Sequence, residues 1–292
     1  MTRAVPQTAP QATMRAVALD ADGRLPVPRP FVAGFEAAGR IVAVGPGVER
    51  GRVGEPVAVL VGGGAHAEVV LAPAVLAVRA EGVDARTAAG FGWSTPTAYD
   101  LVHTVARIGP GDRVLIHGAA GAVGTMAAQF AAAAGAGRIT GVAGNDERSH
   151  YARQFGFHRV VTRDAFPDAL AGESFDAVLD PVGGATRVAS LALLAPHGRL
   201  VAYGEIAGAD PVRVSVGDLL ASGRSLLTHN GDLLGRTHPA RLAESARRAL
   251  ALVADGTVRV DVTAEHALAD VGEAVAGLAA GRTLGKGIVR VR

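Results

Sequence analysis

The chain has 292 residues, a length that is typical of roughly two domains. Hydrophobic residues make up 49% of it and the formal net charge is +2, which excludes a globally disordered protein and gives no basic surface typical of a nucleic-acid binder. The chain contains no cysteine, which excludes disulfides, thiolate metal ligands and cysteine nucleophiles.

The N-terminal part predicts a leader followed by a small β structure. Residues 1–13 are rich in Ala, Pro, Thr and Gln and lack the apolar core of a signal peptide, so we expect a flexible leader, with an upstream start before a true opening at Met14 as the alternative. No apolar stretch reaches the length of a membrane span, and we expect a cytoplasmic protein. Short runs separated by Gly and Pro turns then predict the strands of a small barrel or sandwich. The predicted strands cover residues 14–19, 40–44, 57–61 and 67–71.

From Arg113 onward, the pattern changes to alternating strands and helices. Such alternation predicts an α/β fold with right-handed βαβ units and a doubly wound parallel sheet. The predicted strands cover residues 114–117, 139–143, 160–162, 177–180, 200–203 and 226–229, and the helices 122–134, 147–155, 186–194 and 239–254. After residue 256 the chain returns to β character, with strands at 258–262 and 287–291 around a helix at 267–279. We expect this last stretch to rejoin the N-terminal β region.

A glycine-rich turn follows the first strand of the alternating part and opens a helix. Gly121 lets the backbone approach a pyrophosphate, Gly124 lets the helix pack closely on the strand, and the helix N-terminus offers free N–H groups to an anion. Ala119 stands where a strict GxGxxG motif has glycine, and glycine also ends strands for plain packing reasons. The strand before and the helix after favour a dinucleotide site. Its predicted residues are Ala120, Gly121, Ala122, Val123 and Gly124.

The residues after the second strand indicate which dinucleotide binds. An NAD-binding site places Asp or Glu about 20 residues after the glycine turn, but here the strand is followed by Gly144 and Asn145. Arg148 in the next helix and Arg163 after the third strand can each reach a 2′-phosphate. One such charge-assisted hydrogen bond contributes about 1.5–3 kcal/mol, which favours NADPH over NADH. Asp146 argues against this choice, and arginines that simply solvate a surface are the alternative.

Several ordered segments resemble the zinc-free quinone oxidoreductase (zeta-crystallin-like) branch of the medium-chain dehydrogenase/reductase family. The segments are residues 32–39, 64–68, 97–99, 117–124, 144–148, 180–184, 198–204 and 282–287. The resemblance implies a Rossmann domain over residues 99–256 and a GroES-like catalytic domain built from residues 14–98 and 257–292. It also implies hydride transfer with NADPH and, usually, a homodimer.

The same resemblance implies roles for individual residues. Arg148 falls where a basic side chain commonly meets the 2′-phosphate, and Arg163 falls near a position where a Tyr often does so. Thr97 falls beside the expected nicotinamide pocket. Lys286, the only lysine of the chain, resembles the lysine of the closing motif. The further expected cofactor-binding residues are Gly144, Asn145, Tyr203 and Gly204.

A catalytic zinc ion is not expected. The metal-dependent relatives have Gly-His-Glu where this chain has Gly34, Phe35 and Glu36, and they have a Cys where it has Trp93. A catalytic zinc ion needs three protein ligands from Cys, His or carboxylate side chains, and two of the positions hold apolar aromatic residues instead. We therefore expect a site without metal.

A site without metal can pass a hydride from nicotinamide C4 to a conjugated enone, quinone or enoyl thioester. Donors must then meet the charge that develops on the carbonyl oxygen. The candidate donors are Thr97, Tyr99, Ser94 and His66, of which Thr97, Tyr99 and His66 are the predicted catalytic residues. Phe35, Trp93 and Ser94 are expected to line an apolar substrate pocket. For each of these residues, a role in packing or in a turn is the alternative.

One departure from the family pattern opens other functions. Only nineteen residues lie between Met14 and Gly34, and family members carry a longer segment here, with a loop that frames the nicotinamide. The sequence predicts an NADPH-dependent reductase that acts on a small hydrophobic conjugated carbonyl or quinone, with secondary metabolism as the setting. The alternatives are a nonredox biosynthetic enzyme (a cyclase, dehydratase or isomerase) and a noncatalytic NADPH-binding module.

Overall fold

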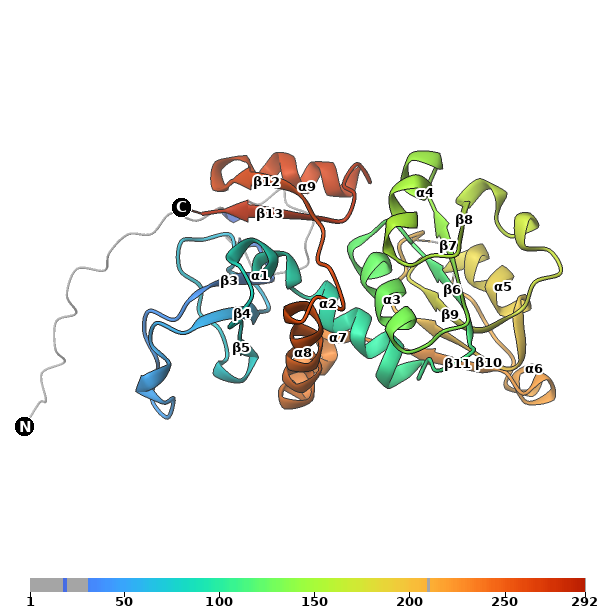
Figure 1. The fold of residues 1–292 in the computed structure, drawn as a ribbon, viewed down its shortest axis with the longest axis horizontal. Coiled ribbons are helices and arrows are strands. Elements are labelled where there is room, and N and C mark those ends of the chain that lie inside the picture. The colour runs from blue at the N-terminus through green and yellow to red at the C-terminus, as the bar shows by residue number, and fades with distance from the viewer. Residues whose placement is uncertain (1–17, 20–30, 209–210, 292) are drawn as a thin grey trace, which may run out of the picture.

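The computed structural model describes residues 18–19, 31–208 and 211–291, so the predicted leader lies outside the described residues. Figure 1 shows a larger lobe around a central sheet and a smaller lobe of β strands, with helices α2, α7 and α8 between them. We call these the Rossmann lobe and the β lobe. No helix of the described part has the length and apolar character needed to cross a membrane.

The Rossmann lobe contains a six-stranded sheet in which all paired strands are parallel. Its order is β11 (Ser225–Thr228), β10 (Leu194–Ala202), β9 (Phe175–Asp180), β6 (Arg113–His117), β7 (Arg138–Ala143) and β8 (Arg159–Thr162). The strand order reverses between β6 and β9. In open α/β sheets, ligands bind at the carboxyl ends of the strands beside such a reversal. The predicted doubly wound parallel sheet is confirmed.

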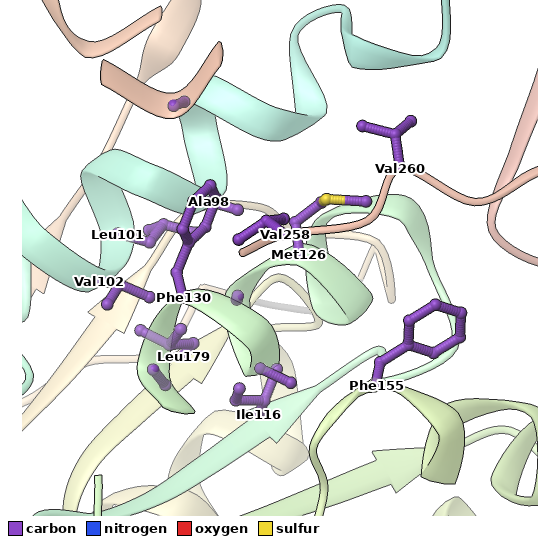
Figure 2. Packing of buried hydrophobic residues seen from close by; sticks show 14 of the residues in the cluster. Ala98, Leu101, Val102, Ile116, Met126, Phe130, Phe155, Leu179, Val258 and Val260 are labelled. Carbon is purple, nitrogen blue, oxygen red and sulfur yellow. The ribbon is translucent and has the colours of Figure 1, made fainter. Parts of the chain in front are cut away.

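Helices cover both faces of this sheet, so its central strands are apolar without alternation. The helices of the lobe are α3 (Ala122–Ala133), α4 (Asp146–Ala152), α5 (Gly184–Ala192) and α6 (Val216–Ser222). Val114, Leu115 and Ile116 of β6 are fully buried. Figure 2 shows Phe130 of α3 in the core between Leu101 and Leu179. This packing fixes the start of α3 against the end of β6.

The β lobe is assembled from both ends of the chain. Strands β3 (Glu36–Arg40), β4 (Pro56–Leu60) and β5 (Ala77–Arg79) form an antiparallel sheet, and β1 (Ala18–Leu19) pairs with β2 (Phe31–Val32). From the C-terminal part, β12 (Val262–Ala267) and β13 (Lys286–Arg290) pair in parallel, with α9 (Val271–Ala279) connecting them. Helix α1 (Ala85–Phe91) contacts β3, β12 and β13 and so joins the two parts. The domain boundaries themselves stay a prediction.

A helical unit connects the lobes. Helix α2 (Ser94–Tyr99) continues directly into a π-helix (Asp100–Val105), and α2 packs on both α3 and α8 (Pro239–Ala254). Helix α7 (Gly231–Thr237) follows β11 and packs on α8. π-Helical turns are rare and occur frequently at functional sites, so we expect the region around Asp100 to lie near one.

Two strand predictions are wrong. The strand predicted at 40–44 ends at Arg40. Beyond it the Ile41 N–H bonds the Glu55 carbonyl oxygen at 3.1 Å while the Ile41 carbonyl oxygen accepts from the Gly54 N–H at 2.8 Å, so the regular pairing is lost at Ile41. Residues 68–71 form no strand, and the Leu71 side chain is 95% exposed. Near the C-terminus, β12 begins where the strand predicted at 258–262 ends, and α9 begins at Val271 rather than at 267. The alternation of these segments was visible in the sequence, but their partner strands were not.

Candidate functional site

A smaller cavity, with a volume of about 300 Å³, lies over the glycine-rich turn. Gly118 at the end of β6 has a φ of +66°, and a Cβ at Gly124 would overlap the Gly118 carbonyl oxygen. The residues at this turn must therefore be small for α3 to begin here. Helix α3 begins at Ala122, and its N-cap residue Gly121 provides no side-chain cap, so no side chain competes with an anion for the first N–H groups. The turn thus fits a pyrophosphate. The C-terminal segment also reaches this turn, because the Gly285 N–H donates to the Ala120 carbonyl oxygen at 3.2 Å.

The cavity is lined by eight of the residues predicted to bind the cofactor. These are Ala120, Gly121, Ala122, Val123, Gly124, Gly144, Arg148 and Tyr203. They come from three places: the turn before α3 and its first residues, the loop after β7 with the first turn of α4, and the residue that follows β10. The structure therefore brings residues far apart in sequence to one edge of the sheet.

Arg148 lies in the first turn of α4, beside this cavity. Its Nη2 atom donates to the carbonyl oxygens of Gly281 and Thr283, the latter at 3.1 Å. A guanidinium group carries five N–H bonds, so these contacts leave the Nε and Nη1 donors for a ligand. Arg148 is thus placed to meet a phosphate while it also ties the C-terminal segment to the Rossmann lobe.

Two other predicted residues are placed differently. Asn145 caps α4, because its Oδ1 accepts a hydrogen bond of 2.9 Å from the Arg148 N–H, and it lines neither cavity. Arg163 follows β8, its side chain is 71% exposed, and its nearest ionic neighbour is Asp164 at 3.8 Å. The structure does not bring Arg163 to the cofactor cavity.

The larger cavity is a cleft between the two lobes, with a volume of about 1850 Å³. It is lined by residues of both lobes and of the helical unit between them. The predicted residues among them are Phe35, His66, Trp93, Thr97, Gly121, Ala122, Tyr203, Gly204 and Lys286. Gly121, Ala122 and Tyr203 line both cavities, so the two spaces meet at the start of α3.

Glu36 is the centre of a polar cluster on the β-lobe side of the cleft. It pairs with the Lys286 ammonium group, and its Oε2 accepts a hydrogen bond of 2.5 Å from the Trp93 N–H. The Trp93 indole N–H donates to the Phe35 carbonyl oxygen at 2.7 Å. Lys286 is therefore held by a carboxylate in this structure, and Trp93 is fixed across the cleft floor.

The donor set at this place does not fit a catalytic zinc ion. Phe35 offers no ligand atom, and the indole of Trp93 is only a hydrogen-bond donor. In the described part of the chain, no group of three His, Asp or Glu side chains is arranged to hold a metal ion. The chain contains no cysteine that could replace them.

His66 faces the same cleft from the β lobe. Its Nδ1 atom is buried and has no hydrogen-bond partner among the described residues. Burial lowers the pKa of His66, and the nearby Glu36 carboxylate opposes this effect. The imidazole is therefore uncharged at neutral pH and is able to donate or accept one hydrogen bond.

Thr97 lines the cleft, but two of its predicted neighbours do not. The Tyr99 ring packs at 4.4 Å on His103 and, edge to face, at 5.6 Å on Phe130, measured between ring centroids. Ser94 lies at the start of α2 and lines neither cavity. Tyr99 and Thr97 are two positions apart on a helix and so point in different directions.

A buried ion pair fixes the loops at the sheet's reversal point. Asp180 is fully buried, and its Oδ2 accepts a hydrogen bond of 2.7 Å from Arg187 Nε, whose side chain is 8% exposed. Asp180 Oδ1 accepts from the Val182 N–H at 2.7 Å, and Arg187 Nη2 donates to the Gly204 carbonyl oxygen at 2.8 Å. This pair holds the ends of β9 and β10 in one arrangement beside the cleft.

Sequence reasoning missed the residues at the end of β11. His229, Asn230 and Asp232 line the cleft opposite the β lobe. A Cβ added at Gly231 would lie 3.5 Å from Thr97 Oγ1 and 3.6 Å from His229 Nε2. The signal was present, because the strand predicted at 226–229 ends at His229 and ligands bind at the carboxyl ends of parallel strands.

The structure combines a Rossmann lobe that carries a glycine-rich turn with a β lobe built from both chain ends. This combination is typical of two-domain dinucleotide-dependent oxidoreductases, and matches to family models support this class. Residues 12–82 match the alcohol dehydrogenase GroES-like domain, and residues 122–253 match the zinc-binding dehydrogenase domain. The chain belongs to the medium-chain dehydrogenase/reductase superfamily, and the resemblance seen in the sequence is confirmed.

Among individual relatives, the quinone oxidoreductase of Pseudomonas aeruginosa is 33% identical over 278 residues, which cover 91% of this chain and 84% of the relative. A mycocerosic acid synthase-like polyketide synthase of Mycobacterium tuberculosis is 34% identical over 279 residues. That match covers 92% of this chain, but the chain spans only 13% of the length of the synthase.

Two solved structures complexed with NADPH have the same fold. The quinone oxidoreductase of Escherichia coli superposes with a TM-score of 0.80 at 28% identity, and the mycobacterial protein Rv1454c with a TM-score of 0.82 at 29% identity. Each match covers 94% of this chain and 89% of the other.

Proposed function

We propose that this protein is an NADPH-dependent reductase of conjugated carbonyl compounds or quinones. The observation that carries the proposal is the junction of the two cavities at Gly121, Ala122 and Tyr203. A dinucleotide whose pyrophosphate lies at the start of α3 extends from there into the larger cleft. The binding of NADPH by related structures of the same fold supports this choice of cofactor.

Arg148 supports NADPH over NADH. It is the basic side chain that lines the smaller cavity. A second phosphate on the adenine ribose would gain a charge-assisted hydrogen bond from it, whereas a hydroxyl group would gain much less. The glycine at position 144 allows the Arg148 side chain to lie close to this loop, since a Cβ at Gly144 would be only 3.3 Å from Arg148 Cδ.

The cleft suits a flat apolar acceptor. Phe35 and Trp93 form part of its wall, and Val61 and Leu233 add apolar surface. When bound, the reduced nicotinamide supplies the hydride. The negative charge then develops on the acceptor's carbonyl oxygen, and a pre-positioned donor in a water-poor cleft stabilises it. Thr97 and His66 are the predicted catalytic residues that the structure brings to this cleft.

Two ion pairs hold the elements around the cleft in place. The ion pair of Glu36 with Lys286 ties β13 to β3 and to the start of α2. Asp180 and Arg187 hold the backbone at Gly204, where the nicotinamide ribose is expected. Rigid placement of this kind reduces the entropy lost when donor and acceptor are brought together.

The acceptor class remains part of the proposal. Quinones follow from the name of the Pseudomonas relative, and enoyl thioesters are the conjugated acceptors that fit a synthase of fatty-acid-like chains. The expected homodimer and the expected setting in secondary metabolism stay predictions.

The test is a turnover assay on the purified chain. NADPH is mixed with a benzoquinone, a cyclic enone or a crotonyl thioester, and the loss of nicotinamide absorbance is followed. We expect steady oxidation of NADPH with at least one acceptor. Tight NADPH binding without oxidation by any acceptor would contradict the reductase and favour the nonredox enzyme or the binding module.

A further inference from the structure

His229 is a partly buried histidine that directly follows β11, on the Rossmann side of the cleft. Its backbone N–H donates to the Ala202 carbonyl oxygen at 3.0 Å, which fixes the residue beside the end of β10. The residue lines the cleft, yet its Nε2 atom is buried and has no hydrogen-bond partner among the described residues. A buried ring nitrogen without a partner costs free energy, so a ligand or a positioned water is expected to complete it.

The imidazole is uncharged in the resting protein. Burial lowers the pKa of His229 most, Arg241 on α8 lowers it further, and Asp100 on the π-helix opposes both. A neutral imidazole has one N–H donor and one acceptor nitrogen. Such a group donates a hydrogen bond to a developing oxyanion without carrying a charge that would have to be desolvated beforehand.

Thr97 stands beside His229. A Cβ added at Gly231 would lie 3.5 Å from Thr97 Oγ1 and 3.6 Å from His229 Nε2. A side chain at position 231 would therefore fill the space between the hydroxyl and the imidazole. The two polar groups come from different elements, α2 and the end of β11, and face one part of the cleft.

A buried carboxylate begins the π-helix that continues from α2. Asp100 is 1% exposed, and its Oδ1 accepts hydrogen bonds from Thr104 at 2.8 Å and from Ser245 at 2.7 Å. Its Oδ2 has no partner among the described residues. The π-helix begins at Asp100, directly after the helix that carries Thr97. The negative charge of Asp100 opposes the effect of burial on the pKa of His229.

We infer that His229 is a catalytic residue that donates a hydrogen bond to the substrate's carbonyl oxygen. The inference rests on the proposed reductase function. The hydride forms a bond to the β-carbon, the C=C electron pair shifts toward the carbonyl carbon, and the C=O pair moves onto the oxygen that His229 meets. A proton from water then completes the α-carbon, so the product is the saturated carbonyl compound and the oxidised cofactor.

The first test is His229→Asn, assayed with NADPH and the best enone or enoyl thioester. Loss of one oxyanion donor costs on the order of 10²–10³ in kcat, and we expect a loss in this range with unchanged NADPH affinity. The matched control is His238→Asn, because His238 is exposed and does not line the cleft. The control should keep wild-type turnover.

The outcomes separate the two claims. A His229→Asn variant that binds NADPH and keeps wild-type kcat overturns the role of His229, while the wild-type turnover still supports the reductase. A wild-type chain that oxidises no NADPH with any acceptor overturns the proposed function and this inference with it.

A second measurement does not depend on the folding of that variant. In nitrogen-15 NMR of the wild-type chain with oxidised cofactor, adding the saturated carbonyl product should shift the His229 ring resonances and leave those of His238 unchanged. Unshifted His229 resonances at saturating product would overturn the assignment.

Discussion

At the scale of single residues, the site depends on side chains whose partners lie far away in sequence. Arg148 was expected to read a phosphate, and it does line the smaller cavity, but it also binds two carbonyl oxygens of the C-terminal segment. Lys286 was assigned to the closing motif, and its charge is met by Glu36. Sequence reasoning found these residues by type and order, whereas their partners depend on the fold.

Arg148→Ala should weaken NADPH binding about 10- to 100-fold and NADH binding much less, because one charge-assisted hydrogen bond to the extra phosphate is lost. Isothermal titration with both cofactors measures the two affinities. Arg153→Ala is the control, since Arg153 is exposed at the end of the same helical segment and lines neither cavity. Equal losses for NADPH and NADH would mean that Arg148 does not select the phosphate.

At the scale of elements, local patterns were enough for β6, the glycine turn and α3, and the structure has all three where the sequence predicts them. The middle of β6, from Val114 to Ile116, is apolar because both sheet faces are covered, and Gly124 permits the close start of α3. The strand predicted at 67–71 was wrong, because a short, mostly apolar run does not say whether a partner strand is present. The π-helix at Asp100 had no signal in the sequence that we recognised.

The contact between β6 and α5 gives a pH dependence of stability. His117 Nε2 lies 2.8 Å from Ser190 Oγ, and burial lowers the pKa of His117 to about 4 from 6.5, with Asp180 opposing the shift. The unfolded chain therefore binds a proton that the folded chain does not, and stability falls as the pH drops from about 6.5 to about 4. The loss from this group alone reaches about 3 kcal/mol at its upper limit.

Urea unfolding at a series of pH values measures this slope. His117→Asn, which removes the titrating group, should unfold with a shallower dependence between pH 6.5 and 4. The half-buried His66, His103 and His229, whose pKa values are also lowered, keep part of this dependence. A variant with the full wild-type slope would show that His117 is not responsible.

At the scale of the whole molecule, the two lobes meet around one cleft, and the groups that the proposed chemistry needs come from both sides of it. The glycine turn and His229 come from the Rossmann lobe, and Phe35 and His66 come from the β lobe. The two-domain plan was predictable because the resemblance extends over ordered segments of the whole chain. The proximity of Thr97 and His229 was not, because it arises only when α2 and the segment after β11 come together in the fold.

The most direct test of the central claim follows the hydride itself. The chain is incubated with NADPH that carries deuterium on the transferring face of nicotinamide C4 and with the enone or enoyl thioester that it turns over best. The product is then analysed by mass spectrometry and NMR. The account predicts one deuterium on the β-carbon of the saturated product, in step with cofactor oxidation. A product that forms without deuterium, or that forms while NADPH is not consumed, would contradict it.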